Sequence, residues 1–142
     1  MHEPHSLIKA DIQAFYAAYN RRDWDDWLAR ADPELEWDPV EERDSFRGRE
    51  TLIRLAENWL ATWAQFEWTP EEIEIAPAGD LLFVAARSHG RSRGSDAPIE
   101  GYFFHVVRLR DGKPWRVREF TDRGDAITAF RAAGGADAGA AC

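Results

Sequence analysis

The chain has 142 residues, enough for one domain but not for two full hydrophobic cores. Its formal net charge of −8 argues against nucleic acid as a main partner, because nucleic-acid binding begins from a basic surface. Hydrophobic residues make up 44% of the sequence and aromatic residues 13%, with seven tryptophans. This surplus of aromatic residues fits either a core between helices and a curved sheet or the wall of a small-molecule pocket.

No feature of the sequence indicates export or membrane insertion. Residues 1–5 hold neither the basic nor the apolar region of a signal peptide, and no run approaches the ~18 apolar residues of a membrane span. The only cysteine is Cys142, so no internal disulfide can form. We therefore expect a cytoplasmic protein with no membrane partner. Residues 134–142, mostly Gly and Ala, predict a disordered tail after a single domain over residues 1–133.

The first half of the chain predicts three helices and one short strand. Ser6 can cap the first helix and Asp23 the second, and Gly48 opens the third. The strand spans residues 34–40, with Pro39 at its end or on a sheet edge. The apolar residues expected on the inner faces of the three helices are Ile8, Ile12, Phe15 and Tyr19; Trp24, Trp27, Leu28 and Ala31; and Leu52, Leu55, Ala56, Trp59 and Trp63.

From Phe66 onward the hydrophobic period changes to two, which predicts strands. The expected strands span residues 66–76, 81–93, 99–110 and 115–121, and a short helix over 122–133 ends the fold. Pro70 indicates a sheet edge or a bulge, and Asp111-Gly112 indicates a tight hairpin. The order predicts an α+β fold, in which a cone-shaped, curved antiparallel or mixed sheet wraps around the three N-terminal helices. The interior of such a cone is a natural pocket.

Three stretches of sequence resemble a known group of families. They are residues 17–24 (AAYNRRDW), residues 36–40 (EWDPV) with 46–50 (FRGRE), and residues 105–113 (HVVRLRDGK) with 118–123 (REFTDR). With the order of elements over residues 6–133, they resemble the SnoaL-like polyketide cyclases and steroid Δ-isomerases of the nuclear-transport-factor-2-like superfamily. The resemblance implies the cone fold, but it leaves function open, because this fold hosts many unrelated activities.

The resemblance implies two catalytic candidates, Asp38 and His105, which we expect to be the polar groups of one pocket. Asp38 falls where the isomerases place their general base, although an Asp before Pro39 also suits a simple turn. His105 falls near the position of the isomerases' protonated aspartic acid, which hydrogen-bonds the oxyanion. Strand alternation places His105 on the interior face with Phe103, where it either acts on a ligand or is a core histidine bound to a backbone carbonyl.

Two further acidic residues are candidates near the end of the last strand. In the polyketide cyclases an acidic residue here serves as the acid/base, and Glu119 or Asp122 matches it. Glu119 shares the interior parity of Trp115, so a partner such as His105 or an arginine is expected. Asp122 equally suits the N-cap of the last helix.

The chain departs from both well-known chemistries of the fold. The isomerase oxyanion tyrosine falls at Phe15, with Tyr19 one turn along, and the Arg-x-Asp motif of the related epoxide hydrolases is missing from residues 100–105. The aromatic residues expected to wall the pocket are Phe15, Tyr19, Trp59, Trp63, Phe103 and Trp115.

No metal or cofactor is expected, because the four histidines fall in no ligand spacing and no Gly-rich phosphate loop is present. Strand 99–110 is apolar on both faces, so we expect a homodimer that covers the outer residues Tyr102, Phe104 and Val106. Two hypotheses remain. One is a cofactor-free acid/base enzyme of the isomerase, cyclase or hydrolase class, acting on a small apolar substrate with a carbonyl or epoxide. The other is a non-catalytic ligand-binding or dimerisation module.

Overall fold

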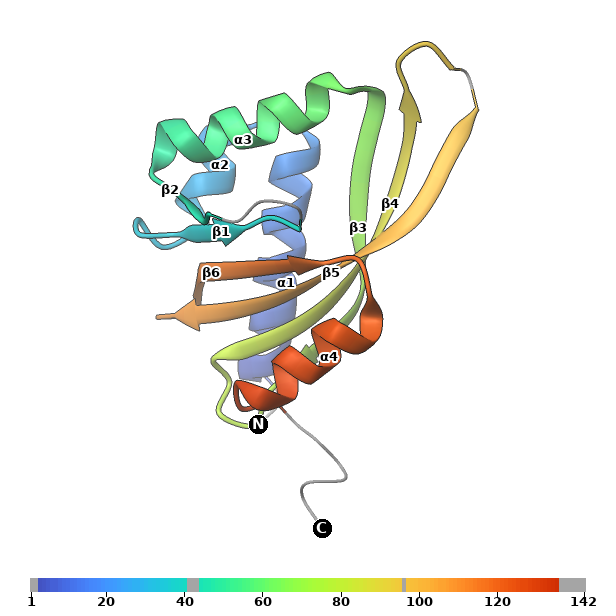
Figure 1. Cartoon of the computed structure of the whole chain (residues 1–142). Coiled ribbons are helices and arrows are strands. Elements are labelled where there is room, and N and C mark those ends of the chain that lie inside the picture. Colours follow the sequence, from blue (N-terminus) through green and yellow to red (C-terminus); the bar gives the residue numbers. More distant parts are fainter. Residues whose placement is uncertain (1–2, 41–43, 96, 136–142) are drawn as a thin grey trace.

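The computed structural model describes residues 3–40, 44–95 and 97–135. These residues form four helices and six strands (Figure 1). The elements are α1 (Glu3–Asn20), α2 (Trp24–Ala29), β1 (Glu36–Asp38), β2 (Phe46–Arg47), α3 (Arg49–Ala61), β3 (Trp63–Ile75), β4 (Leu81–Ser92), β5 (Pro98–Arg110), β6 (Lys113–Phe120) and α4 (Arg123–Ala132). This is the α+β order that the change of hydrophobic period predicts.

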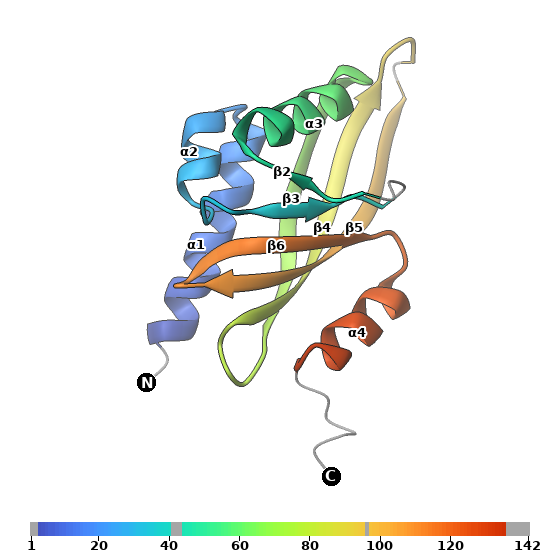
Figure 2. The ribbon, with the colours of Figure 1, turned by 60° about the vertical axis from the view of Figure 1, so that its left-hand side comes forward.

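The sheet has six strands in the order β2-β1-β6-β5-β4-β3. Strands β1 and β6 pair in parallel and all other neighbours are antiparallel, so the sheet is mixed. Strand β3 is an edge, and its register shifts between Pro70 and Glu72, as expected for a proline in a strand. The sheet curves around α1, α2 and α3 on one side, and α4 lies on the other (Figure 2). The cone fold is confirmed.

Each face of the sheet carries its own hydrophobic core. Strand β4 shows the division most clearly, because its side chains alternate between the two cores along a fully buried run. Leu82 and Val84 join the inner core, under the three N-terminal helices, whereas Leu81 and Phe83 join the outer core, under α4. Strand β4 is therefore apolar on both faces because both faces are covered by helices of the same chain.

Several predicted boundaries are confirmed and others are wrong. Asp23 and Asp122 cap α2 and α4, and their carboxylates accept hydrogen bonds from backbone N–H groups three residues later. Ser6 is not a cap, because α1 begins at Glu3 and places Pro4 in its first turn, where a missing N–H costs little. The helical placement of Trp63 is also wrong.

The third helix ends at Ala61 and Trp63 begins strand β3. The hydroxyl of Thr62 donates to the carbonyl of Trp59 at 2.7 Å and closes the last turn. Residues Phe46–Arg47 form the short strand β2 where a loop was expected. The hairpin at Asp111-Gly112 is confirmed by positive φ angles of 53° and 79°. The expected tail lies, from residue 136 onward, outside the described residues.

The surface predicted to form a homodimer is only partly exposed. Phe104 and Val106 are buried in the outer core with Phe130 of α4, whereas Tyr102 is 45% exposed. The prediction that a second copy must cover the outer face of this strand is therefore wrong for Phe104 and Val106, because α4 of the same chain covers them. Homodimerisation itself stays a prediction.

Candidate functional site

The inner core contains a cavity of about 440 Å³ between the sheet and α3. Its wall combines residues from three helices and from strands β1, β2, β3, β5 and β6, so it exists only in the folded chain. The aromatic residues that line it are Tyr19, Trp27, Trp37, Phe46, Trp59, Trp68 and Phe103. A cavity of this size and character suits a small, flat, apolar molecule.

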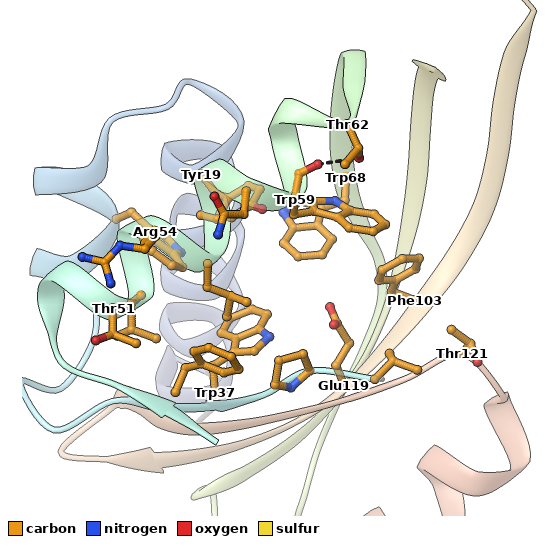
Figure 3. Close-up of a pocket in the computed structure, with 18 residues that line it drawn as sticks. Tyr19, Trp37, Thr51, Arg54, Trp59, Thr62, Trp68, Phe103, Glu119 and Thr121 are labelled. Carbon is orange, nitrogen blue, oxygen red and sulfur yellow. Dashed lines mark hydrogen bonds between the residues drawn. The ribbon is translucent and has the colours of Figure 1, made fainter. Parts of the chain in front are cut away.

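Glu119 of β6 supplies the carboxylate of this cavity. Its side chain is 10% exposed, and its carboxylate projects into the space below Trp59 and Phe103 (Figure 3). Arg54 also lines the cavity, but its side chain is exposed and its guanidinium group points away from Glu119 (Figure 3). Among the charged residues described at the cavity wall, Glu119 is therefore the one whose charged group points into the cavity.

Two buried side chains, His105 and Tyr16, form a hydrogen-bonded series that begins at Glu119. The Nε2 atom of His105 lies 3.0 Å from a carboxylate oxygen of Glu119, and the hydroxyl of Tyr16 lies 2.5 Å from Nδ1 of the same ring. His105 and Glu119 are direct cross-strand partners in β5 and β6, which places both side chains on the inner face. His105 is 0% exposed, so its expected inward direction and its pairing with Glu119 are both confirmed.

Aromatic rings enclose the imidazole of His105. Its ring centre lies 5.7 Å from that of Tyr16, 5.4 Å from Trp37 and 5.1 Å from Trp68. Burial, and then the negative charge of Glu119, raise the pKa of Tyr16 well above its ordinary value. Burial also raises the pKa of Tyr19. Both hydroxyls therefore keep their protons at neutral pH, and that of Tyr16 can donate a hydrogen bond to His105.

The cavity wall holds hydrogen-bond donors that the protein leaves unused. Within the described residues, the buried indole N–H groups of Trp59, Trp63 and Trp68 have no acceptor. Trp59 and Trp68 line the cavity, whereas Trp63 packs behind it against Trp59 and Phe66. The three N–H groups are themselves buried, and a buried donor without an acceptor costs about 1–3 kcal/mol.

The structure does not bring Asp38 and His105 together. Strand β1 alternates, so Trp37 points into the cavity and Asp38 points to the other face of the sheet. There the guanidinium group of Arg116 donates to Asp38 at 2.8 and 3.2 Å. The expectation that Asp38 and His105 face one cavity is contradicted by this alternation.

Asp38 lines a separate polar cleft of about 570 Å³ together with Arg116, Arg118 and Asp122. Asp122 is also the N-cap of α4, which confirms the interpretation of this residue as a helix cap. Glu119 lines this cleft as well as the cavity, so its carboxylate lies at the boundary between an apolar and a polar region.

Three of the six aromatic residues predicted to wall the pocket line the cavity: Tyr19, Trp59 and Phe103. Phe15 packs in the core against Tyr16 and Trp27, and Trp115 is half-buried with the Arg110 guanidinium 4.3 Å from its ring centre.

The sequence reasoning missed Trp27, Trp37, Phe46 and Trp68 as lining residues, and it missed Tyr16 entirely. Two signals were available. Trp37 and Trp68 alternate with polar neighbours on their strands, and Tyr16 lies four residues after Ile12 on the buried face of α1.

No group of three or more His, Cys, Asp or Glu side chains suited to a metal ion occurs within residues 3–40, 44–95 and 97–135. In the same ranges, every helix is too short or too polar to cross a membrane.

Comparison with known proteins identifies the family. A family model described as a SnoaL-like domain matches residues 12–117. No sequence among curated proteins matches the chain.

Three solved structures share the fold. TerC co-crystallised with polyporic acid is 20% identical, with 87% of this chain and 96% of that chain covered and a TM-score of 0.70. A protein from Jannaschia sp. CCS1 described as a SnoaL-like polyketide cyclase is 19% identical, with 89% of this chain and 93% of that chain covered and a TM-score of 0.71. An LEH-like epoxide hydrolase from Mycobacterium tuberculosis is 16% identical, with 89% and 91% covered and a TM-score of 0.64. Identities this low establish the fold alone.

Proposed function

Because the chain belongs to the SnoaL-like domain family, we propose that it binds a small apolar molecule in the inner cavity and acts on it by acid/base catalysis without a cofactor. Glu119 is the proposed general base, and the substrate carries a carbonyl or an epoxide. The observation that supports this most strongly is the carboxylate of Glu119, only 10% exposed and aimed into an aromatic cavity, with His105 bound behind it.

The proposed step for a carbonyl substrate moves one proton and two electron pairs. Glu119 takes a proton from the carbon next to the carbonyl, the electrons of that C–H bond form a C=C double bond, and the π electrons of the C=O bond move to the carbonyl oxygen. The protonated Glu119 then returns the proton at another atom of the substrate. The indole N–H groups of Trp59 and Trp68, which have no acceptor among the described residues, are the proposed donors to the oxygen as its negative charge develops.

The neighbours with the same fold are compatible with this range of chemistry. The names of two of them describe a polyketide cyclase and an epoxide hydrolase, and a third was crystallised with polyporic acid. We carry over from them only the substrate type: a small molecule with a largely apolar body and oxygen atoms that accept hydrogen bonds.

The decisive experiment compares Glu119→Gln with Asp38→Asn. Both variants replace a carboxylate by the isosteric amide, one in the cavity and one on the other face of the sheet. Purified proteins are incubated with a panel of ketones and epoxides, and substrate loss and deuterium exchange are followed. We expect Glu119→Gln to lose at least about 100-fold in rate and Asp38→Asn to keep the wild-type rate. Equal turnover by wild type and Glu119→Gln would remove Glu119 from the chemistry.

A non-catalytic binding protein is the second candidate. The observation that favours it is that Glu119 is the one charged side chain, among the described residues of the cavity wall, that projects inward, whereas much acid/base chemistry uses two placed groups. Native mass spectrometry of freshly purified protein tests this candidate. A stoichiometric bound molecule, with no turnover by wild-type protein, would favour binding over catalysis.

A further inference from the structure

We propose that Tyr16 is a positioning residue that locks His105 in the tautomer whose Nε2–H donates to Glu119, so that the imidazole orients the base but never takes its proton. This inference rests on the proposed role of Glu119. Tyr16 does not line the cavity and would act only through His105.

The donor and acceptor roles follow from the two contacts of the imidazole. An ionised carboxylate only accepts, so Nε2 of His105, 3.0 Å from Glu119, must carry a hydrogen. A neutral imidazole with a hydrogen on Nε2 has a lone pair on Nδ1, and the hydroxyl of Tyr16 donates to it across 2.5 Å. In this arrangement the hydroxyl of Tyr16 and both ring nitrogens of His105 have hydrogen-bond partners.

The opposite tautomer has a specific cost. With the hydrogen on Nδ1, the ring would donate to the oxygen of Tyr16, and the hydroxyl hydrogen would lose its acceptor. His105 is the one partner that the structure gives this hydroxyl within the described residues, and Tyr16 is only 2% exposed. Leaving a buried hydroxyl unpaired costs about 1–3 kcal/mol.

The lock matters most once Glu119 has taken a proton. A neutral carboxylic acid can either accept from Nε2–H or donate to a bare Nε2. The second option would draw the proton away from the substrate and turn it toward the imidazole. Tyr16 disfavours that option, because the tautomer with a bare Nε2 leaves its own hydroxyl unpaired. The proton therefore stays on the carboxyl group of Glu119, from which it can return to the substrate in the cavity.

Nitrogen-15 spectra of the imidazole ring test the lock without any substrate. His105 is buried, unlike the exposed His5 and His89, and the two ring nitrogens give distinct signals with and without a bound hydrogen. In wild-type protein at neutral pH we expect hydrogen on Nε2 and none on Nδ1. A hydrogen on Nδ1 in wild-type protein would overturn the proposal, and this measurement needs no variant.

The role of Tyr16 is isolated in the Glu119→Gln background, which mimics the neutral base. Gln can donate or accept, so only Tyr16 then selects the tautomer. We expect Glu119→Gln to keep the hydrogen on Nε2, and the double variant with Tyr16→Phe to give a mixture of tautomers. Glu119→Gln with Tyr19→Phe is the matched control, because Tyr19 is also a buried tyrosine of α1 but makes no contact with His105 in the described residues. The same spectrum from both double variants would overturn the lock.

A kinetic test separates this proposal from the proposed function. If turnover is found, Tyr16→Phe alone should lower kcat about tenfold and leave KM unchanged, since one hydrogen bond is lost outside the cavity wall. An unchanged kcat would overturn the positioning role. If Glu119→Gln keeps full turnover, the proposed function fails, whereas the spectra still decide whether Tyr16 selects the tautomer.

Discussion

The two cores on either side of the sheet are built from different residues and leave different amounts of space. The inner core holds most of the tryptophans together with Tyr16 and Tyr19, and it encloses a cavity of about 440 Å³. The outer core holds Phe83, Phe104 and Phe130 among Ala, Leu and Val, and it contains no tryptophan among its described members.

The rings of the two cores are also arranged differently. In the inner core, aromatic rings meet at angles from 23° between Trp37 and Trp68 to 88° between Trp59 and Phe66, and both stacked and edge-to-face pairs are favourable. In the outer core, alanines such as Ala85 and Ala126 let α4 lie close to the sheet.

Polar groups follow the same division. The chain of Tyr16, His105 and Glu119 is buried on the inner side, whereas the charged pairs on the outer side are half-exposed. We therefore expect the outer core to contribute chiefly to stability, whereas the inner core leaves the space that the proposed function requires.

Removing the largest side chain of α4 tests the outer core most directly. Phe130 is 1% exposed and packs against Phe83. Phe130→Ala should lower the free energy of unfolding by about 3–5 kcal/mol, because it removes a fully buried ring and leaves a cavity in its place. Urea unfolding measures the change, and Phe130→Leu serves as a milder version if the Ala variant does not fold. A loss below about 1 kcal/mol would contradict the assignment of stability to this core.

High pH tests the inner core through its tyrosines. Burial is the main cause that raises the pKa of Tyr16 and Tyr19 above the ordinary value of 10.0. The unfolded chain therefore loses these protons first, so the stabilisation is complete below about pH 10 and falls as pH rises above it. Each tyrosine should contribute about 1.4 kcal/mol of loss per pH unit there.

Tyr19→Phe should accordingly reduce the slope of stability against pH by the share of one tyrosine, about 1.4 kcal/mol per pH unit. Urea unfolding at about pH 9, 10 and 11 measures that slope. An unchanged slope in Tyr19→Phe would mean that this hydroxyl ionises as readily in the folded protein as in the unfolded chain, and would contradict its burial.

The sequence predicted the fold well because the fold depends on local patterns. The change of period at residue 66, the Asp caps of α2 and α4 and the Asp111-Gly112 hairpin are each decided within a few residues. Boundaries failed where two patterns overlap. Trp63 fits the helical period of α3, but it also begins the alternation of β3, and the strand prevails.

The site was harder to predict because it depends on which face each strand turns inward. The position of Asp38 matched the isomerase base, yet alternation with the buried Trp37 sends it outward. His105 and Glu119 were predicted correctly to point inward, because alternation along each of two neighbouring strands places them on the inner face. Tyr16 was missed because its hydroxyl gains a role only when α1 packs against a strand 89 residues later in the chain.

Truncating a cavity wall should cost less stability than truncating the outer core. Phe103 is half-buried and contacts Trp59 and Trp68 on the cavity side. Phe103→Ala should lower the free energy of unfolding by only about 1–2 kcal/mol, because its ring already borders empty space. Binding of an apolar fluorescent probe should weaken in the same variant. A loss as large as that of Phe130→Ala would show that the inner wall is packed as tightly as the outer core.

The ion pair between Asp38 and Arg116 should have the smallest effect. Its side chains are 24% and 40% exposed, and exposed pairs typically contribute about 0–1 kcal/mol. Asp38→Asn should therefore change the free energy of unfolding by less than about 1 kcal/mol, and salt should reduce the difference further. Urea unfolding at low and high salt, in a double-mutant cycle with Arg116→Gln, measures the coupling. A coupling above about 2 kcal/mol, or a loss of ligand binding in Asp38→Asn, would mean that the outer cleft and the inner cavity act as one site, and the division between the two faces would fail.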